Sequence, residues 1–366
     1  MWNFQNPVEI ISGNDALNSL RNRINERSYS IVTYDNDVFK EYTQEVIQAI
    51  GHQPNQIIDG VVENPHFDNL TQLCKQLGKQ ETKTEVFVAL GGGSVMDTTK
   101  VLAASSGDFN NIADYLTGQI DADALTYQEI IAIPTTAGTG SEVTHWGTIW
   151  DPENDAKYSL ADQRLYPTAA IVHAPFTAKL PVSITVSTGL DALSHALESL
   201  WNKNRNPISA VFAVTASKAI IAILPELVKQ PTNLTLRTKM QEASLMAGLA
   251  FSNTKTSIAH NMSYAVTLDK GTPHGIACSF TLPTIIRSID TSDLELIHYL
   301  ESIFNSNIEQ AANQMEQFLE ALNIETDPIS YGYSKQQWHQ LVEQASQGQR
   351  GKNFSGNIKQ LIANFN

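Results

Sequence analysis

The first half of the chain alternates short apolar runs with amphipathic stretches, and this alternation constrains the fold more than any other feature. Residues Tyr29–Thr33, Val86–Leu90 and Ile130–Ile133 contain mostly large or β-branched side chains and give way to Gly, Pro or Asp, as buried strands do. Between them lie helical patterns such as Phe67–Leu77, which has leucines on one face. Strand–helix alternation predicts a parallel α/β sheet with ligands at the carboxyl ends of its strands.

The pattern changes after about Leu180. Runs such as Ile208–Val228, Leu236–Leu249 and Ile308–Leu322 have helical periodicity, with almost no alternating stretch among them. A chain of 366 residues is also long for a single hydrophobic core. We therefore expect an α/β dinucleotide-binding domain over residues 1–180 and an all-helical domain over residues 181–366.

Composition narrows the class of protein. Hydrophobic residues make up 42% of the chain, too many for a disordered protein, and apolar stretches such as Ala210–Val214 and Ala219–Leu224 fall short of the roughly 20 residues of a membrane span. Only Cys74 and Cys278 are present, which excludes a disulfide framework. No signal peptide is visible, so we expect a cytoplasmic protein. The net charge of −14 argues against nucleic acid or a membrane as partner.

Two glycine-rich segments follow predicted strands and suit phosphate binding. The strand Val86–Leu90 runs into Gly91–Lys100, where glycines let backbone N–H groups approach an anion at the start of a helix. Pro134–Glu142 alternates hydroxyl side chains with glycines, which suits a pyrophosphate or a ribose. Either segment alone could be an ordinary turn. Together they favour a nucleotide site, although neither is the Rossmann G-x-G-x-x-G motif.

A set of acidic and imidazole side chains in the second half suits a divalent cation. Asp191 and His195 lie one helical turn apart and project from the same face, and His260 and His274 follow at a distance. Three histidines and one aspartate suit Fe²⁺ or Zn²⁺ with a position left for a substrate oxygen. The alternative is that Asp191 and His195 are only a helix-surface pair.

Taken in order, these segments resemble the iron-containing (group III) alcohol dehydrogenase family. The family signatures extend from about residue 5 to at least residue 285. They are Asn64-Pro65, Gly91–Lys100, Thr135–Glu142, Gly189–Glu198, Ala247–Asn253, and His260 followed by Pro273-His274-Gly275.

The resemblance implies an N-terminal dinucleotide-binding domain and a helical domain that binds metal and substrate. It implies NAD(H) or NADP(H) as cofactor, Fe²⁺ as the expected metal with Zn²⁺ as the alternative, and a homo-oligomer, commonly a dimer. By position, the four metal ligands are Asp191, His195, His260 and His274. The cofactor-contacting positions are Asn64, Gly92, Gly93, Ser94, Asp97, Thr135, Thr136, Thr139, Ser141 and Lys157.

The chain departs from the family pattern at Tyr264. Many members carry a histidine four residues after the third ligand, where it is thought to relay a proton. A phenol is a weaker base than an imidazole, so reduction should be easier than oxidation near neutral pH. Tyr264 could instead pack against the substrate.

At the end of the first strand, either Tyr34 or Asp35 could take the place of the family aspartate that repels NADP. The choice between NAD and NADP as cofactor stays open, with NAD favoured.

Basic residues near the C-terminus suggest an anionic substrate. Arg350 and Lys352 could form a solvated turn or bind an anionic group. With Tyr264, the run Pro273–Pro283 is similar to family members linked to phosphonate metabolism, which reduce phosphonoacetaldehyde to 2-hydroxyethylphosphonate. The expected function is therefore hydride transfer between NAD(P)H and a small aldehyde or alcohol, with an anionic aldehyde such as phosphonoacetaldehyde as the finer expectation. Its rivals are a dehydroquinate-synthase-like lyase that uses NAD and a metal, and a non-catalytic nucleotide-binding relative.

Overall fold

A computed structural model describes residues 1–154 and 156–365. The chain divides into two compact units. The sheet unit is built from Pro7–Thr136 and Ser141–Lys179, and the helical unit from Leu180 onward together with Met1–Asn6 and Ala137–Gly140. Two short segments from the first 180 residues thus group with the helices.

The sheet unit contains a parallel sheet with strand order β1-β8-β5-β4-β2-β3, so the predicted α/β class is confirmed. The strands are β1 (Glu9–Ser12), β2 (Tyr29–Val32), β3 (Gln56–Ile58), β4 (Val86–Gly91), β5 (Glu129–Pro134) and β8 (Ala169–Val172). An antiparallel pair, β6 (Trp146–Asp151) and β7 (Ala156–Ala161), lies outside this sheet.

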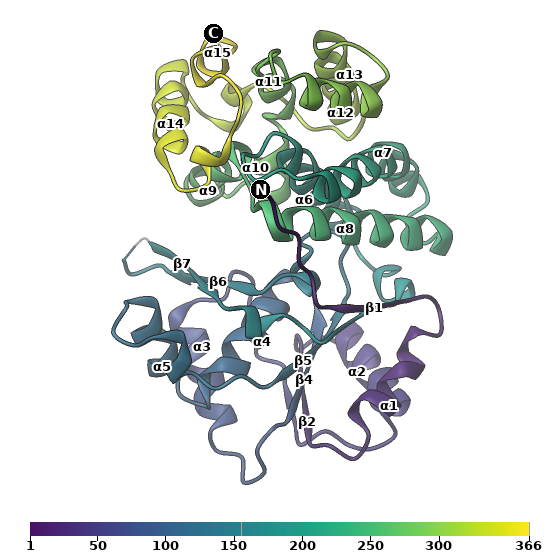
Figure 1. The fold of residues 1–366 in the computed structure, drawn as a ribbon. Coiled ribbons are helices and arrows are strands. Elements are labelled where there is room, and N and C mark those ends of the chain that lie inside the picture. The colour runs from purple at the N-terminus through teal and green to yellow at the C-terminus, as the bar shows by residue number, and fades with distance from the viewer. Residues whose placement is uncertain (155, 366) are drawn as a thin grey trace. The chain divides into compact units, whose positions relative to one another are not determined.

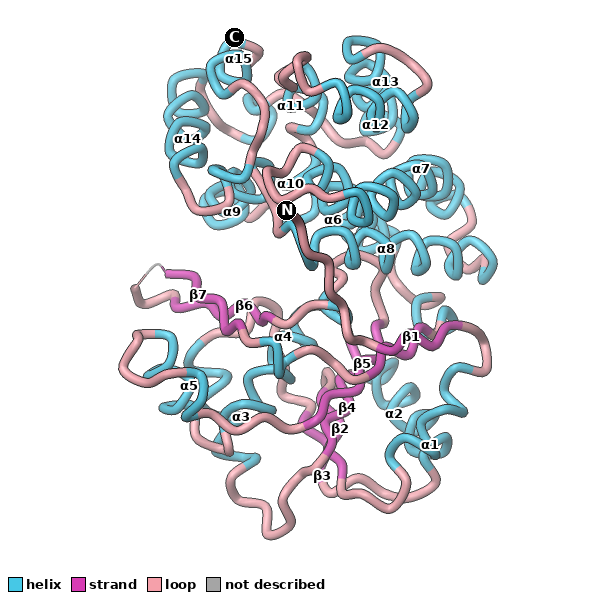
Figure 2. Tube along the Cα trace, viewed as in Figure 1, coloured by secondary structure: helices cyan, strands magenta, loops and turns pink. Residues whose placement is uncertain are grey.

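Each face of the sheet has its own hydrophobic core, because successive side chains of a strand point to opposite faces. In β4, Val86, Val88 and Leu90 join one core, and Phe87 and Ala89 join the other. The first core is closed by α1 (Ser19–Ile24) and α2 (Asp37–Ile50). The second is closed by α3 (Phe67–Leu77), α4 (Gly93–Ser105) and α5 (Phe109–Leu116) (Figures 1 and 2).

The strand order reverses beside β2. The chain leaves β2 for β3 on one side and returns to β4 on the other, so the carboxyl ends of β2 and β4 lie next to each other. The hydroxyl of Thr33, just after β2, donates to the carbonyl of Leu90 in β4 at 2.9 Å. Open parallel sheets bind ligands where the strand order reverses. The glycines after β4 therefore occupy the expected binding edge.

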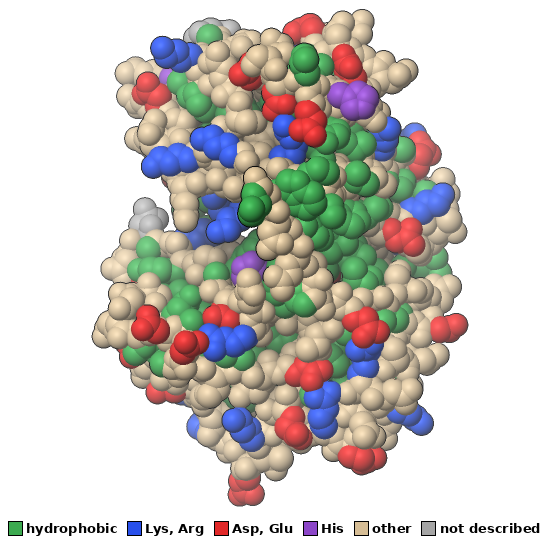
Figure 3. Space-filling model, viewed as in Figure 1, with side chains coloured by type: hydrophobic (Ala, Val, Ile, Leu, Met, Phe, Trp, Pro, Cys, Tyr) green, Lys and Arg blue, Asp and Glu red, His purple; other side chains and the backbone are tan. Residues whose placement is uncertain are grey.

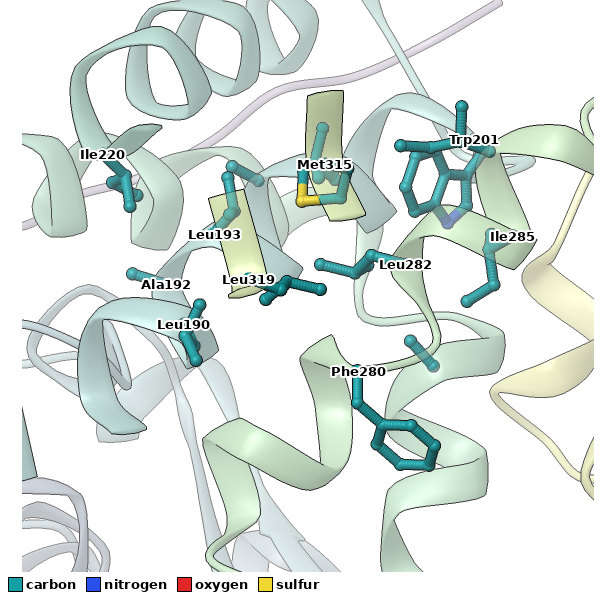
Figure 4. Packing of buried hydrophobic residues seen from close by; sticks show 14 of the residues in the cluster. Leu190, Ala192, Leu193, Trp201, Ile220, Phe280, Leu282, Ile285, Met315 and Leu319 are labelled. Carbon is teal, nitrogen blue, oxygen red and sulfur yellow. The ribbon is translucent and has the colours of Figure 1, made fainter. Parts of the chain in front are cut away.

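The helical unit has a single large core to which nearly every helix contributes. Figure 4 shows part of it, including Leu193, Trp201, Phe280 and Met315. Its helices are α6 (Val182–Leu200), α7 (Pro207–Lys229), α8 (Leu234–Thr254), α9 (Ile258–Lys270), α10 (His274–Ser279), α11 (Leu282–Arg287), α12 (Leu294–Phe304), α13 (Ile308–Ala321), α14 (Lys335–Gln347) and α15 (Ile358–Ala363). Short 3₁₀ turns connect elements at Ala16–Asn18, Ala122–Ala124, Ser141–Val143, Gln163–Leu165, Ala174–Thr177, Pro328–Tyr331 and Gly351–Asn353.

Helix α7 is the one described helix that is long and apolar enough to cross a membrane. It has 23 residues, and its most apolar window has a mean hydropathy of 1.9. The apolar runs within it are short because Ser, Thr and Lys interrupt them, but its average stays high. Ala213, Ile220 and Leu224 are fully buried in the core, and the core helices of many proteins have the same composition.

Candidate metal centre and nucleotide-binding loops

Helix α6 places three polar side chains on one buried face. Asp191, His195 and Glu198 follow one another at helical spacings of four and three residues, so they point the same way. Their exposed fractions are 4%, 5% and 0%. Buried charged groups are costly unless they are paired or bind a metal. This face is therefore built for a specific partner.

Three histidines surround one oxygen of Asp191. The Nε2 atom of His260, from α9, lies 3.3 Å from Asp191 Oδ1, and those of His195 and His274 each lie 3.8 Å from it. Asp191 Oδ1 and His260 Nε2 are buried and accept or donate no hydrogen bond within the described residues. Donors bound to a common cation at about 2.1 Å lie roughly 3–3.5 Å apart. The four residues expected from the sequence thus come together around Asp191 Oδ1.

The protonation of His195 and Asp191 also suits a cation. Burial lowers the pKa of His195 to about 4, so its imidazole is neutral at pH 7, as a metal ligand must be. Burial would raise the pKa of Asp191, but the charges of His195 and the other histidines hold it well below its usual range. At neutral pH the carboxylate is ionised and acceptor-only.

Glu198 orients His260, and the sequence analysis gave it no role. Its Oε2 lies 2.7 Å from His260 Nδ1, and its two oxygens accept backbone N–H groups from Ser257, Ala259 and His260 at 2.8, 2.6 and 3.3 Å. A carboxylate at Nδ1 fixes the proton there and leaves the Nε2 lone pair for the ion. The spacing of Glu198 from Asp191 could have indicated this role, because both residues lie on the same face of α6.

Cys278 also belongs to the cluster, and the sequence analysis did not assign it. Its Sγ lies 3.6 Å from His274 Nε2, one turn earlier in α10. One ligand atom from each of Asp191, His260, His274 and Cys278 lies within 4.8 Å of all the others. His195 completes the surroundings, with its ring stacked between those of Phe251 at 4.0 Å and His260 at 4.5 Å.

The sheet unit holds the glycine-rich turn between β4 and α4. Helix α4 begins after Gly92, an N-cap residue that has no side chain to cap the first N–H groups, and a side chain at Gly92 would touch Thr136 at 3.2 Å. The hydroxyl of Ser94 accepts from the backbone N–H of Asn64 at 3.3 Å, and Asn64 has a left-handed φ of +53°. Free N–H groups at a helix start form an anion site.

A buried network connects this turn to the segment after β5. Lys100 Nζ donates to the carbonyl and hydroxyl of Ser141 at 2.9 and 2.8 Å. The Ser141 hydroxyl in turn donates to Asp97 at 3.0 Å, and the second Asp97 oxygen accepts from the Thr148 N–H at 3.0 Å. Burial lowers the pKa of Lys100 to about 8 and raises that of Asp97. Asp97 and Ser141 therefore hold each other in place.

The remaining expected cofactor positions are spread over both units. Gly93 is the first residue of α4, and Thr135 follows β5, where its N–H donates to the carbonyl of Gly91 at 3.1 Å. Lys157, in β7, lies over the ring of Trp150 at 4.9 Å. Thr139 is in the segment that groups with the helical unit.

Of the two basic residues near the C-terminus, only Arg350 lies beside the histidine cluster. Its guanidinium carbon is 5.4 Å from the centre of the Tyr264 ring, and that ring is parallel to the His274 ring at 6.4 Å. Arg350 Nη1 donates to the Thr256 hydroxyl at 2.8 Å, and Arg350 forms no ion pair with any described carboxylate. Lys352 is exposed.

Comparison with known protein families accounts for this arrangement. The iron-containing alcohol dehydrogenase profile matches residues 7–174, and the profile of the C-terminal part of the Fe-containing alcohol dehydrogenase family matches residues 185–364. The chain belongs to the iron-containing alcohol dehydrogenase family. The predicted family is thus confirmed across both units.

Individual relatives within this family have diverged considerably. The NAD-dependent methanol dehydrogenase of Bacillus methanolicus is 33% identical over 230 residues, which is 63% of this chain and 60% of that protein. A 1-propanol dehydrogenase of Citrobacter freundii is 27% identical over 88% of this chain and 79% of its own. The chain thus spans about 60% of the methanol dehydrogenase.

A solved structure covers the chain more completely. The sulfoacetaldehyde reductase of Bifidobacterium kashiwanohense, in complex with NAD⁺, superimposes with a TM-score of 0.91 at 28% identity. The match covers 100% of this chain and 98% of the other. This structure extends the likeness to the whole of this chain, including the C-terminal segment that carries Arg350.

Proposed function

We propose that this protein is a metal-dependent oxidoreductase that transfers a hydride between a nicotinamide cofactor and a small aldehyde or alcohol. The observation that carries the proposal is the approach of three imidazole Nε2 atoms to within 3.8 Å of one Asp191 oxygen. The family membership and the dehydrogenase and reductase names of the relatives support it.

The chain's own residues prepare the metal site for this reaction. A divalent cation, Fe²⁺ with Zn²⁺ as the alternative, would be held by Asp191, His195, His260 and His274, and when bound it supplies Lewis-acid stabilisation of negative charge on a substrate oxygen. Glu198 holds His260 with Nε2 directed at Asp191. Burial keeps water from the carboxylate, which strengthens every electrostatic contact there.

The glycine-rich turn would hold the dinucleotide. Backbone N–H groups at the start of α4 suit the pyrophosphate, and Asn64, Ser94 and Thr136 lie beside that turn. We propose NAD(H) rather than NADP(H). Tyr34 is half-buried and hydrogen-bonds Ser94, whereas Asp35 is exposed and paired with Lys40 at 2.8 Å. The NAD⁺ in the sulfoacetaldehyde reductase structure agrees with this choice.

We propose that the substrate is a short aldehyde with a terminal anion, phosphonoacetaldehyde, which would be reduced to 2-hydroxyethylphosphonate. Arg350 is a guanidinium without a carboxylate partner among the described residues, in a chain of net charge −14. Its guanidinium lies over the ring of Tyr264, and that ring is parallel to the imidazole of His274. An anionic group near Arg350 would thus leave the aldehyde end directed toward the histidines. The name of the sulfoacetaldehyde reductase makes a sulfonate the second candidate.

Aldehyde reduction by the purified protein tests the proposal. The protein is stripped with a chelator, reloaded with Fe²⁺ or Zn²⁺, and mixed with NADH or NADPH and each of phosphonoacetaldehyde, sulfoacetaldehyde and propanal. We expect NADH to be consumed one-for-one with aldehyde, fastest with phosphonoacetaldehyde. Equal kcat/KM for all three aldehydes would remove the anionic substrate. No reduction under any condition would overturn the oxidoreductase itself and favour the lyase or the non-catalytic relative.

The proposal also includes the domain limits, the oligomeric state and the role of Tyr264. We propose the domain limits 1–180 and 181–366, a homo-oligomer in solution, and Tyr264 as a proton relay that favours reduction. Light scattering coupled to gel filtration measures the oligomeric state directly. The relay is tested by Tyr264→Phe, which should lower kcat for reduction while leaving metal content unchanged.

A further inference from the structure

We propose that Thr256 is a positioning residue for substrate selectivity, because it holds the Arg350 guanidinium in the orientation that binds an anionic group of the substrate. This role rests on the proposed function, since it concerns the anion that Arg350 would bind. It falls to a buried threonine for which the sequence analysis gave no role.

Two contacts hold the Arg350 side chain, one at its edge and one at its face. Its Nη1 atom donates to the Thr256 hydroxyl at 2.8 Å, and its guanidinium carbon lies 5.4 Å from the centre of the Tyr264 ring. Among the described residues, no other group accepts a hydrogen bond from this guanidinium. A guanidinium has five N–H donors, so the bond to Thr256 leaves enough of them for a bidentate contact with a phosphonate or a sulfonate.

Thr256 can orient Arg350 because its own backbone is fixed. Thr256 is 2% exposed, and its carbonyl accepts from the side-chain amides of Asn202 and Asn353 at 3.4 and 3.0 Å. The Asn202 amide also donates to the carbonyl of Lys255 at 3.1 Å, and Lys255 has a left-handed φ of +64°. A residue other than glycine keeps such a φ only where the surrounding structure imposes it. The turn that carries the hydroxyl is therefore held in one conformation.

The same turn is joined to the carboxylate that orients His260. The backbone N–H of Ser257, the next residue after Thr256, donates to Glu198 Oε2 at 2.8 Å, and that oxygen lies 2.7 Å from His260 Nδ1. Thr256 thus ties the side chain of Arg350 to the part of the helical unit that carries the histidines. An anion bound there would lie at a fixed separation from the imidazoles, as the orientation of a short substrate requires.

The size of the effect follows from the cost of ordering a long side chain. An arginine that is free to move loses conformational entropy when an anion binds it, and a hydrogen bond made beforehand removes part of that cost. Loss of the Thr256 hydroxyl should therefore weaken anion binding about three- to tenfold and leave neutral substrates unaffected. The KM for an anionic aldehyde should rise with little change in kcat, because the anion is held equally in the ground state and the transition state.

Isosteric substitution of Thr256 in the full-length protein tests the proposal. Thr256→Val replaces the hydroxyl by a methyl group, Thr256→Ser keeps the hydroxyl, and Thr254→Val is the control. Thr254 is also fully buried, two residues earlier, but its hydroxyl donates to that of Ser199 at 3.1 Å. One measurement is kcat/KM for phosphonoacetaldehyde relative to propanal, with NADH and metal-loaded protein. The other is the Kd of ethylphosphonate, a non-reactive anion, by isothermal titration calorimetry.

We expect both quantities to report the loss of the hydroxyl. In Thr256→Val the selectivity ratio and the affinity for ethylphosphonate should fall together by about three- to tenfold. Thr256→Ser and Thr254→Val should resemble the wild type. In an Arg350→Ala background, Thr256→Val should change neither quantity further, because the threonine acts only through Arg350.

The two measurements separate the positioning role from the proposed function. Weaker ethylphosphonate binding in Thr256→Val, in a protein that reduces no aldehyde, would overturn the oxidoreductase and support the positioning role. Wild-type selectivity and affinity in Thr256→Val would overturn the positioning role and leave the oxidoreductase standing.

Other results would also contradict the role of the hydroxyl. An equal loss in Thr256→Ser or Thr254→Val would attribute the effect to packing of the turn, and a further loss in the Arg350→Ala background would mean that Thr256 does not act through Arg350. Wild-type protein that binds ethylphosphonate no more tightly than 1-propanol would remove the anion site, and the positioning role with it. Circular dichroism establishes that each variant is folded, and Thr256→Ala takes the place of Thr256→Val if the valine variant is not.

Discussion

The carboxylate of Glu198 and the imidazole of His260 form a buried pair in which Oε2 lies 2.7 Å from Nδ1. Burial lowers the pKa of His260, but Cys278 and Glu198 more than offset this and raise it well above the ordinary value, so a cation that binds Nε2 must displace a proton from it. The same carboxylate accepts the first backbone N–H groups of α9. One side chain therefore fixes both the start of the helix and the orientation of the ligand that the helix carries.

Replacing Glu198 by Gln tests this dual role. The amide keeps the size of the side chain but loses the charge, so the His260 ring is no longer fixed with Nε2 toward Asp191. We expect Zn²⁺ affinity to fall about 10–100-fold, because losing a carboxylate that holds a ligating imidazole has that effect, and the melting temperature to drop. Glu226→Gln is the control, since Glu226 is half-exposed on α7 and its carboxylate pairs with Lys229. Unchanged Zn²⁺ affinity in Glu198→Gln would show that the pair is not needed to orient His260.

Gly275 keeps α10 close to α6. A methyl group at this position would lie 1.8 Å from the carbonyl oxygen of Ser187, so Gly275→Ala must move α10 away. Overpacking of this kind costs about 1–3 kcal/mol, and we expect urea denaturation to show a loss of this size together with weaker Zn²⁺ binding. Ile276→Val, a smaller change on the same helix, should leave Zn²⁺ binding intact. A Gly275→Ala protein as stable as the wild type would contradict the close packing of the two helices.

The buried amine of Lys100 predicts a pH dependence of stability. Its pKa is lowered from 10.5 to about 8 by burial, so between these pH values the unfolded chain holds a proton that the folded chain has released. The contribution of Lys100 to the free energy of unfolding therefore rises with pH across this window, by about 3 kcal/mol in total. Urea denaturation of the wild type and of Lys100→Met at several pH values tests this. The free energy of unfolding of the wild type should increase relative to that of the variant as the pH rises. The exposed Lys239→Met is the control, and a difference that is constant or shrinks with pH would refute the prediction.

Three of the central strands, β2, β4 and β5, could be predicted from the sequence, whereas the buried strand β8 was not named. Tyr29–Val32 and Val86–Gly91 are buried on both faces, and a continuous apolar run is the signature of such a strand. Strand β1 was not expected because it lies at an edge with most of its side chains exposed, and β3 because it has only three residues. A strand of three residues is too short to show a periodicity, and an exposed edge strand lacks the continuous apolar run.

The metal cluster could be predicted only in part, because some of its contacts join residues that are far apart in the sequence. Asp191 and His195 are one turn apart on a long helix, so their common face follows from spacing. Glu198 acts on backbone groups at Ser257–His260, a contact about 60 positions along the chain that no local pattern records. Cys278 lies on a helix of six residues, where spacing from His274 was the sole clue. Long-range contacts of this kind require coordinates.

The position of Arg350 predicts a change in substrate selectivity. Arg350→Ala removes the cation that lies over Tyr264, so the ratio of kcat/KM for phosphonoacetaldehyde to that for propanal should fall about 10–100-fold, the value of one charge-assisted hydrogen bond. Arg350→Lys should recover part of the ratio, since an ammonium keeps the charge but not the planar fork. Arg287→Ala is the control, because Arg287 is occupied by Glu309 and Glu316. If the ratio stays at its wild-type value in Arg350→Ala, the anion is recognised by another group.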